Sequence, residues 1–109
     1  MATNAHPMPT LDRRDTAALT EYMTVLDDVG RARHAPFLYS VTSQSGREYL
    51  VDVTTGACEC DDAFYRQPDG GCKHLRRVQF ATGRRDIPEW ADRSRIDPDL
   101  GRHVTEENV

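Results

Sequence analysis

Cys58-Glu59-Cys60 and, after a gap of eleven residues, Cys72-Lys73-His74 are the two stretches that decide how the rest of the chain is interpreted. They hold all 3 cysteines of the 109-residue sequence and one of its 4 histidines. Three thiolates and one imidazole form a donor set that closes a tetrahedral zinc site. The sequence therefore predicts that one Zn²⁺ is bound by the side chains of Cys58, Cys60, Cys72 and His74.

The composition is that of one small domain with a thin core. Hydrophobic residues make up 38% of the chain and charged residues 29%, and the formal net charge is -4. A chain of this size often needs a staple, and a metal ion is one kind of staple. The acidic balance excludes a polycation that binds nucleic acid through its overall charge.

The cysteine count and the lack of long apolar runs indicate a reducing compartment. An odd number of cysteines argues against a disulfide framework. No stretch has the pattern of a signal peptide or reaches the roughly 18 apolar residues of a membrane span. We therefore expect a cytoplasmic protein without a membrane partner. All its Lys and Arg residues except Lys73 are arginine, which together with the acidic excess is typical of a salt-adapted prokaryote such as a haloarchaeon.

A β-hairpin is expected before the first ligand pair. Residues 37–42 and 48–53 are rich in aromatic and β-branched side chains, and turn residues separate them. Residues i and i+2 of an extended chain point the same way, so Cys58 and Cys60 can both face one metal ion. The hairpin and the extended segment after it thus supply the first half of the site.

A helix is expected from the second ligand pair onward. Residues 72–82 carry a helical apolar face and are followed by Gly83, a usual helix stop. Cys72 and His74 can share a metal only if Cys72 precedes the first full turn, because residues i and i+2 lie about 200° apart around a helix. We therefore predict an α+β fold, a small zinc-stapled ββα finger over residues 37–85.

The residues before the finger predict an amphipathic helix. Residues 1–9 hold two prolines and no apolar period, and are expected to be a disordered lead. Residues 10–36 are interpreted as a helix capped by Thr10 and a linker. The helix is expected to reach about residue 29, and its apolar stripe consists of Leu19, Tyr22, Met23, Leu26 and Val29. Two interpretations stay open: the stripe packs on the finger, or it docks a partner, including a second copy of the chain in a homodimer.

The residues after the finger predict a tail. Residues 86–109 are acidic and polar, and are expected to be partly disordered. Ile87 and Trp90 are exceptions, which either fold back onto the domain or form a contact site for a partner. His34, in the linker, has the chemistry of a metal ligand but no cysteine near it in the sequence, and is not expected in the site.

The segment around the second ligand pair is strongly basic. Residues 70–85 contain five cationic side chains and no acidic one, namely Lys73, Arg76, Arg77, Arg84 and Arg85. Such an asymmetry in an acidic chain is typical of a surface that meets an anionic partner such as DNA. The alternative is that these cations form ion pairs within the same domain, with Asp52, Glu59, Asp61 or Asp62.

The ligand pattern CxCx11CxH, between a hairpin and a helix, resembles the SWIM-type zinc finger. The resemblance covers about residues 37–83. It rests on Cys58, Cys60, Cys72 and His74, followed by Leu75-Arg76-Arg77. What the resemblance implies is a structural zinc ion and a regulatory adaptor that binds DNA or a protein partner, without catalysis.

Two other functions are weighed against this interpretation. An enzyme could use Cys72 as a nucleophile and His74 as its base, but the spacing suits co-ligands better and no third residue orients the pair. No phosphate-binding glycine loop is present in the sequence either. A redox switch that releases zinc from the paired thiols is a minor alternative. We therefore expect a protein that is not an enzyme.

Overall fold

The computed structural model describes residues 11–101. The predictions for residues 1–9, and for the part of the tail beyond residue 101, lie outside this range. No helix within the range is both long and apolar enough to cross a membrane. The elements, in order, are α1 (Arg13–Thr20), β1 (Met23–Asp27), η1 (Gly30–Ala32), β2 (Leu38–Ser43), β3 (Glu48–Asp52), β4 (Ala57–Cys58), η2 (Asp62–Arg66), α2 (Lys73–Ala81) and η3 (Arg93–Arg95).

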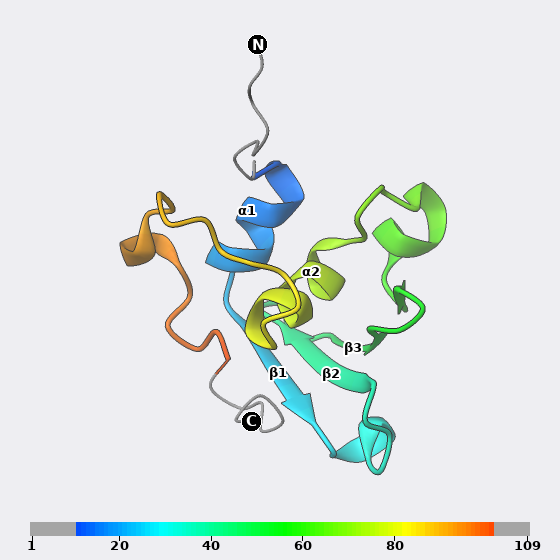
Figure 1. Ribbon diagram of the computed structural model, residues 1–109. Coiled ribbons are helices and arrows are strands. Elements are labelled where there is room, and N and C mark those ends of the chain that lie inside the picture. The colour runs from blue at the N-terminus through cyan, green and yellow to red at the C-terminus, as the bar shows by residue number, and fades with distance from the viewer. Residues whose placement is uncertain (1–10, 102–109) are drawn as a thin grey trace.

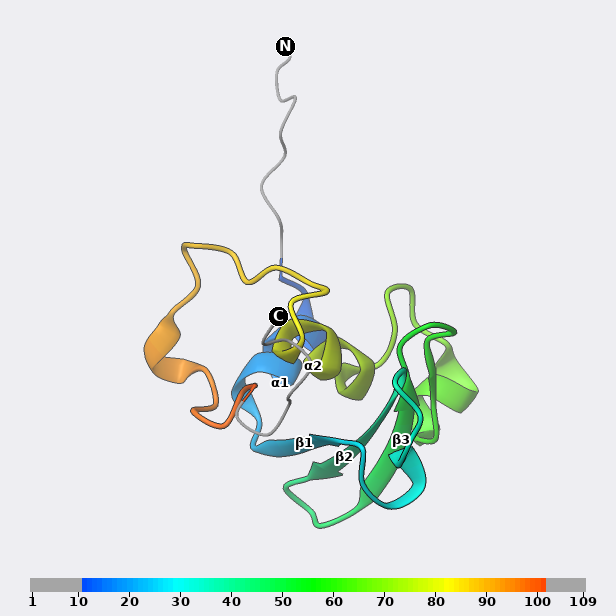
Figure 2. The same ribbon diagram turned by 60° about the horizontal axis from the view of Figure 1, so that its bottom comes forward.

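One antiparallel sheet carries both α-helices on the same face. Its strand order is β1-β2-β3-β4, and each neighbouring pair is antiparallel. Figures 1 and 2 show α1 and α2 beside each other over the sheet, with η2 projecting to one side. The predicted α+β class, a hairpin followed by a helix, is confirmed.

The hairpin of β2 and β3 forms the centre of the sheet. Tyr39 pairs with Val51, and Val41 pairs with Tyr49. Because alternate side chains of a strand point to one face, Tyr39, Val41 and Val51 all turn toward the helices and are buried. The two strands lie within one residue of their predicted bounds.

The predicted helix over residues 10–29 is wrong in its second half. α1 ends at Thr20, and residues 23–27 form β1, which pairs with β2. Met23 and Val25 both point into the core, which is the two-residue period of a strand. The predicted helical stripe, with its steps of three and four, includes Met23 but not Val25. Hydrogen bonding to the edge of β2 decides the outcome, because tertiary pairing overrides weak helical preferences.

The apolar stripe predicted on that helix is divided between two places. Leu19 packs from α1 and Met23 packs from the sheet, and the chain itself buries both. No helix spans residues 21–29 of the described chain, so the predicted stripe is not one continuous helical surface. α1 begins at the N-cap Asp12, two residues later than predicted, in a reciprocal capping box.

The buried side chains form two clusters that meet at α2. The first, here called the sheet core, contains Met23, Val25, Tyr39, Val41, Val51, Cys60, Cys72, Leu75 and Val78. The second, here called the tail core, contains Ala18, Leu19 and Phe80, with Leu11, Ile87, Ile96 and Leu100 packed against them. Val78 and Phe80 stand on opposite faces of α2, so this helix serves both cores.

Residues 86–101, the first part of the predicted tail, pack against the rest of the domain. Ile87 and Ile96 pack on the tail core, and Asp97 is buried. The backbone N–H of Asp97 also donates to the carbonyl of Leu19, at 2.8 Å. Ile87 thus folds back, whereas Trp90 lies at the rim of a shallow cleft beside α1 and remains 53% exposed. A few apolar residues and one buried acid are enough to hold this segment, although its composition is mostly polar.

Candidate metal centre

The structure brings the four predicted ligands together. Cys58 ends β4 and Cys60 follows it, while Cys72 and His74 come from the start of α2. Their ligand atoms all lie within 4.8 Å of one another. The Nδ1 atom of His74 is 3.8 Å from the sulfur of Cys58 and 3.9 Å from that of Cys72. These separations fit four donors around one ion of the size of Zn²⁺, since Zn–S bonds of about 2.3 Å separate tetrahedral donors by nearly 4 Å.

The second ligand pair has the geometry that the sequence required. Cys72 is the N-cap of α2, with an extended backbone, so it precedes the first turn and can face the same ion as His74. Gly71, just before it, has a φ of +93° and packs so closely on Leu75 that a Cβ would lie 2.4 Å from that side chain. Only glycine fits such a position without displacement of its neighbour.

Backbone N–H groups support two of the sulfur atoms. The N–H of Leu75 donates to the sulfur of Cys72 at 3.5 Å, and that of Ala63 donates to the sulfur of Cys60 at 3.4 Å. Such bonds favour the thiolate over the thiol, because they stabilise negative charge on sulfur. The elements that follow the two ligand pairs therefore prepare the sulfur atoms for a cation.

The protonation of the cluster is shared among its members. Hydrogen bonds from the thiols of Cys58 and Cys72 hold the pKa of Cys60 well below its usual range. The bond to Cys60 raises the pKa of Cys58 in turn. Burial tends to lower the pKa of His74, but its interactions with Cys60 and Cys72 outweigh burial and raise the pKa to about 9. A metal ion that binds here must therefore displace protons from the ligands.

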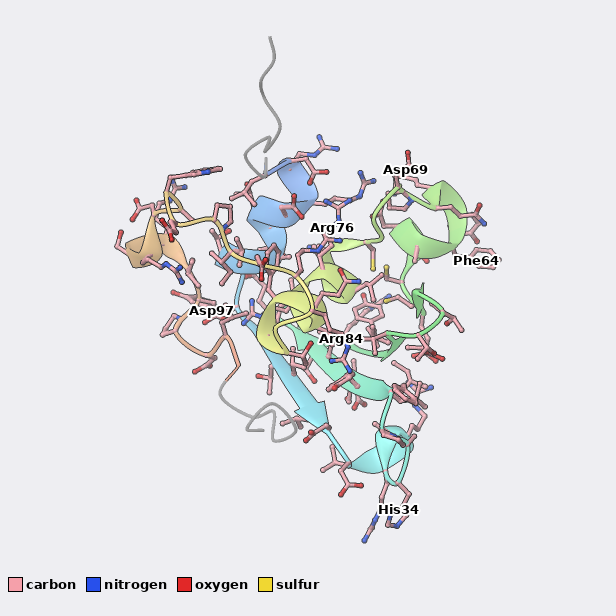
Figure 3. All side chains as sticks on the ribbon, in the orientation of Figure 1. His34, Phe64, Asp69, Arg76, Arg84 and Asp97 are labelled. Atoms are coloured by element: carbon pink, nitrogen blue, oxygen red, sulfur yellow. The ribbon has the colours of Figure 1, made fainter. Side chains whose placement is uncertain are left out.

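The surroundings close the site on one side and leave access on another. Cys60, Cys72 and His74 are buried and Cys58 is half-buried. The ring of Tyr49 packs on the imidazole of His74, with 4.4 Å between the centroids. Cys60, Cys72 and His74 also line a cleft between α1 and η2, which offers an entry path for an ion. His34 is absent from the site, as expected: Figure 3 shows it at the far end of the molecule from the start of α2.

Two of the predicted nucleic-acid contacts are internal. The side chains of Arg76 and Arg77 are 3% and 0% exposed, so neither presents its charge to a phosphate group. Arg77 donates to the carbonyls of three residues at the end of α1 and the start of β1, and to the buried carboxylate of Asp97. The prediction that these two arginines contact DNA is therefore wrong. The alternative, in which these cations form ion pairs within the domain, is correct for both arginines.

The acids that pair with the buried arginines differ from those predicted. They are Asp12 and Asp15 for Arg76, and Asp97 for Arg77. In the sequence these acids belong to a helix and a tail that lie outside the predicted finger. Long-range ion pairs of this kind leave no local signal, and only the folded arrangement identifies them.

The other three predicted cations keep some exposure. Lys73 pairs with Glu21 at 2.7 Å and is half-buried. Arg85 is half-buried and reaches Gln79, while Arg84 is exposed and lies 5.8 Å from the centre of the Tyr39 ring. Of the five basic residues predicted to bind nucleic acid, these three are the ones that a partner can reach.

One surface feature was not singled out from the sequence. Phe64 and Tyr65, on η2 between the two ligand pairs, are 69% and 75% exposed and pack edge to face at 4.8 Å. η2 is fastened at its start, where the N–H of Phe64 donates to the carbonyl of Cys60 and Arg14 forms a two-pronged ion pair with Asp62. The sequence does carry a signal for this feature, because two adjacent aromatic residues stand in an otherwise polar stretch.

Comparison with protein-family models, with curated proteins and with solved structures found no match to this chain. The geometry of the site therefore carries the functional argument. Cys58, Cys60, Cys72 and His74 are placed so that they could hold a structural metal ion.

Proposed function

We propose that this protein is a SWIM-like module that holds one structural zinc ion and acts as an adaptor. The observation that carries the proposal is the convergence of three sulfur atoms and one imidazole within 4.8 Å. Soft thiolates with one imidazole in a tetrahedral arrangement favour zinc over harder ions. Four protein donors fill the coordination sphere, so the ion contributes folding energy and leaves no position for a substrate.

The zinc proposal is tested by counting bound metal in matched variants. Zinc analysis of the purified full-length protein should give one ion per chain in the wild type and in His34→Ala, whose side chain lies outside the site. Cys60→Ser should lose the ion, because oxygen is a poorer donor in this set. A full equivalent of zinc in Cys60→Ser would contradict the assignment of the ligands.

For the adaptor role, a protein partner is favoured over DNA. Burial of Arg76 and Arg77 removes the centre of the predicted basic surface. Phe64 and Tyr65 instead present two large aromatic rings to solvent on a loop that the site anchors. Aromatic residues of this kind dominate the binding energy of many protein interfaces. A regulatory or scaffolding adaptor fits these features better than a DNA-binding protein.

Photocrosslinking separates the two partner classes. A photoreactive amino acid in place of Tyr65 should give protein adducts in extract from the organism of origin, and these should disappear when the unlabelled wild type competes. The same group in place of Tyr22, which is 67% exposed and lies in the connection between α1 and β1, serves as the control. Adducts to nucleic acid in place of protein would reverse the choice.

DNA binding through the remaining cations is the second candidate. It is supported by the exposure of Arg84 and the partial exposure of Lys73 and Arg85. Phosphate contacts make affinity fall steeply with salt. A mobility-shift assay over a range of salt concentrations, with Arg84→Ala and Arg85→Ala combined, tests it: binding that the double substitution leaves unchanged would exclude this surface.

A further inference from the structure

Arg76 lies two residues after the last ligand, and its side chain runs back along the start of α2. Figure 3 shows it between α1 and the turn that carries Asp69. That turn, residues 68–71, leads directly into Cys72. Arg76 therefore stands between one ligand of the metal centre and the helix that packs beside it.

The guanidinium of Arg76 uses all three of its nitrogens. Nε donates to the carbonyl of Gly71 at 2.8 Å, and Nη2 donates to the carbonyl of Asp69 at 2.7 Å. Nη1 donates to the carboxylates of Asp12 at 2.5 Å and Asp15 at 3.0 Å. The first two bonds hold the turn before Cys72, and the other two hold the capping box of α1.

The turn that Arg76 holds would otherwise be loosely determined. Gly70 and Gly71 both have positive φ angles, and glycine loses more conformational freedom on folding than any other residue. The two carbonyls that Arg76 binds bracket these glycines. Gly70 also packs against the guanidinium, since a Cβ there would lie 3.1 Å from Nη2. The side chain thus fixes the part of the backbone that sets the position of the Cys72 sulfur.

We propose that Arg76 is a positioning residue of the metal centre, which aims the thiolate of Cys72 by fixing the turn before it and ties that turn to α1. This inference rests on the proposed function, because it requires that the four ligands hold a metal ion. A planar fork of donors is needed to bind two carbonyls and two carboxylates at once, and lysine cannot supply it.

Arg77 is the matched control. It is the next residue of the same helix, it is buried as completely, and it is also paired with a carboxylate. Its side chain donates hydrogen bonds to Ala18, Glu21, Met23 and Asp97. These four partners all lie outside the turn before Cys72. Loss of Arg77 should weaken the fold without a specific effect on any one ligand.

The experiment compares Arg76→Met with Arg77→Met in the full-length, zinc-loaded protein. One measurement is zinc affinity by competition with a chromophoric chelator. The other is the alkylation rate of each cysteine, resolved by peptide mass spectrometry. Removing a group that orients a metal ligand typically weakens metal binding by about 10–100-fold, and we expect this for Arg76→Met. We also expect Cys72 to gain reactivity relative to Cys58 and Cys60.

The ratio of the cysteine rates separates positioning from general stability. Because metal binding is linked to folding, any destabilised variant can lose affinity. Arg77→Met should therefore accelerate all three cysteines together and leave their ratio unchanged. Arg76→Lys should fall between Arg76→Met and the wild type, because it keeps the charge but reaches fewer acceptors.

The outcomes are distinct. If Arg76→Met and Arg77→Met give the same ratio of cysteine rates, the positioning role is overturned while the metal site stands. If neither Arg76→Met nor Arg76→Lys folds at saturating zinc, Arg76 is a general folding determinant, and the positioning role is likewise overturned. If the wild type itself binds no zinc, the proposed function fails first.

Discussion

Different interactions complete the sheet core and the tail core, although neighbouring residues of α2 pack into both. We call each of these sets of interactions a closure. At the edge of the sheet core, three cysteines and a histidine converge on a site for a metal ion. In the tail core, the fully buried pair of Arg77 and Asp97 joins the C-terminal segment to the end of α1. In the proposed metal site the first closure would depend on an ion from solution, while the second uses groups of the chain alone. The two halves should therefore respond to different perturbations.

Removing the metal should have the largest effect. Metal binding in zinc-finger peptides contributes about 10–16 kcal/mol, which is effectively folding free energy. We expect Cys72→Ala, or a strong chelator, to collapse residues 50–83, which hold β4, η2 and α2. Hydrogen exchange by mass spectrometry measures this as lost protection over these residues. His34→Ala is the matched control, and a chelated protein that keeps full protection would contradict the metal dependence of the sheet core.

Breaking the buried ion pair should have the next largest effect and should spare the site. Removing one partner of a buried pair costs about 3–5 kcal/mol, because the other charge stays buried and unpaired. We expect Asp97→Ala to lower the free energy of unfolding by this amount in the zinc-loaded protein, measured with denaturant. The folded fraction should still hold one zinc per chain.

Arg95→Ala provides the comparison for that variant. Arg95 lies on η3 close to Asp97 but is exposed, and surface substitutions usually change stability by less than about 0.5 kcal/mol. If Asp97→Ala were as mild as Arg95→Ala, the ion pair would not close the tail core.

The pH dependence of zinc affinity should distinguish the two closures on a smaller scale. The pKa of His74 is raised to about 9 without metal, so below that pH a proton must leave before the ion binds. Zinc affinity should therefore fall as the pH is lowered from 9 to 7, by about 1.4 kcal/mol per pH unit for each proton displaced. Competition with a chelator at each pH measures the slope.

The tail core should not contribute to that slope. Burial alone would raise the pKa of Asp97, but its hydrogen bonds with Arg77 and with the N–H groups of Asp99 and Met23 hold the pKa below its usual range. The stability that this carboxylate adds is thus complete above the ordinary value of about 3.9 and is lost only as the pH falls through the lower, folded-state pKa. Asp97→Asn should give the same slope between pH 7 and 9 as the wild type, and a flatter slope would link the two closures.

The smallest effect is expected at the exposed aromatic pair. Phe64→Ala and Tyr65→Ala remove side chains that contribute little buried area, so stability should change by less than about 0.5 kcal/mol. Zinc content should stay at one per chain, while partner adducts at η2 should be lost. A large loss of stability would instead show that the pair supports the metal loop, and would remove the argument for a docking surface.

The sequence predicts the sheet core well because its signals are local. Fixed spacing of Cys58, Cys60, Cys72 and His74 defines the site, and alternation of apolar residues defines β2 and β3. The requirement that Cys72 precede the first turn of α2 follows from helix geometry, and the structure has that arrangement. These features need only neighbouring residues and a donor set that suits one ion.

The tail core could not be predicted because its determinants lie far apart in the chain. β1 of the sheet core was missed for a different reason: Met23 also fits a helical period, and pairing with the edge of β2 decides the outcome. Arg77 and Asp97 are 20 residues apart, and each resembles an ordinary surface charge until the fold brings them together. The same holds for Arg76 with Asp12 and Asp15, which explains why a basic segment that suggests DNA binding is largely internal.

The central claim is that Cys58, Cys60, Cys72 and His74 bind one structural ion. Titration of the reduced, metal-free full-length protein with cobalt, followed by absorption spectroscopy, tests it most directly. We expect saturation at one equivalent, the intense ligand-field bands of a tetrahedral ion, and sulfur-to-metal charge transfer from three thiolates. Weak bands of an octahedral ion, or a spectrum unchanged by Cys72→Ala, would contradict the claim.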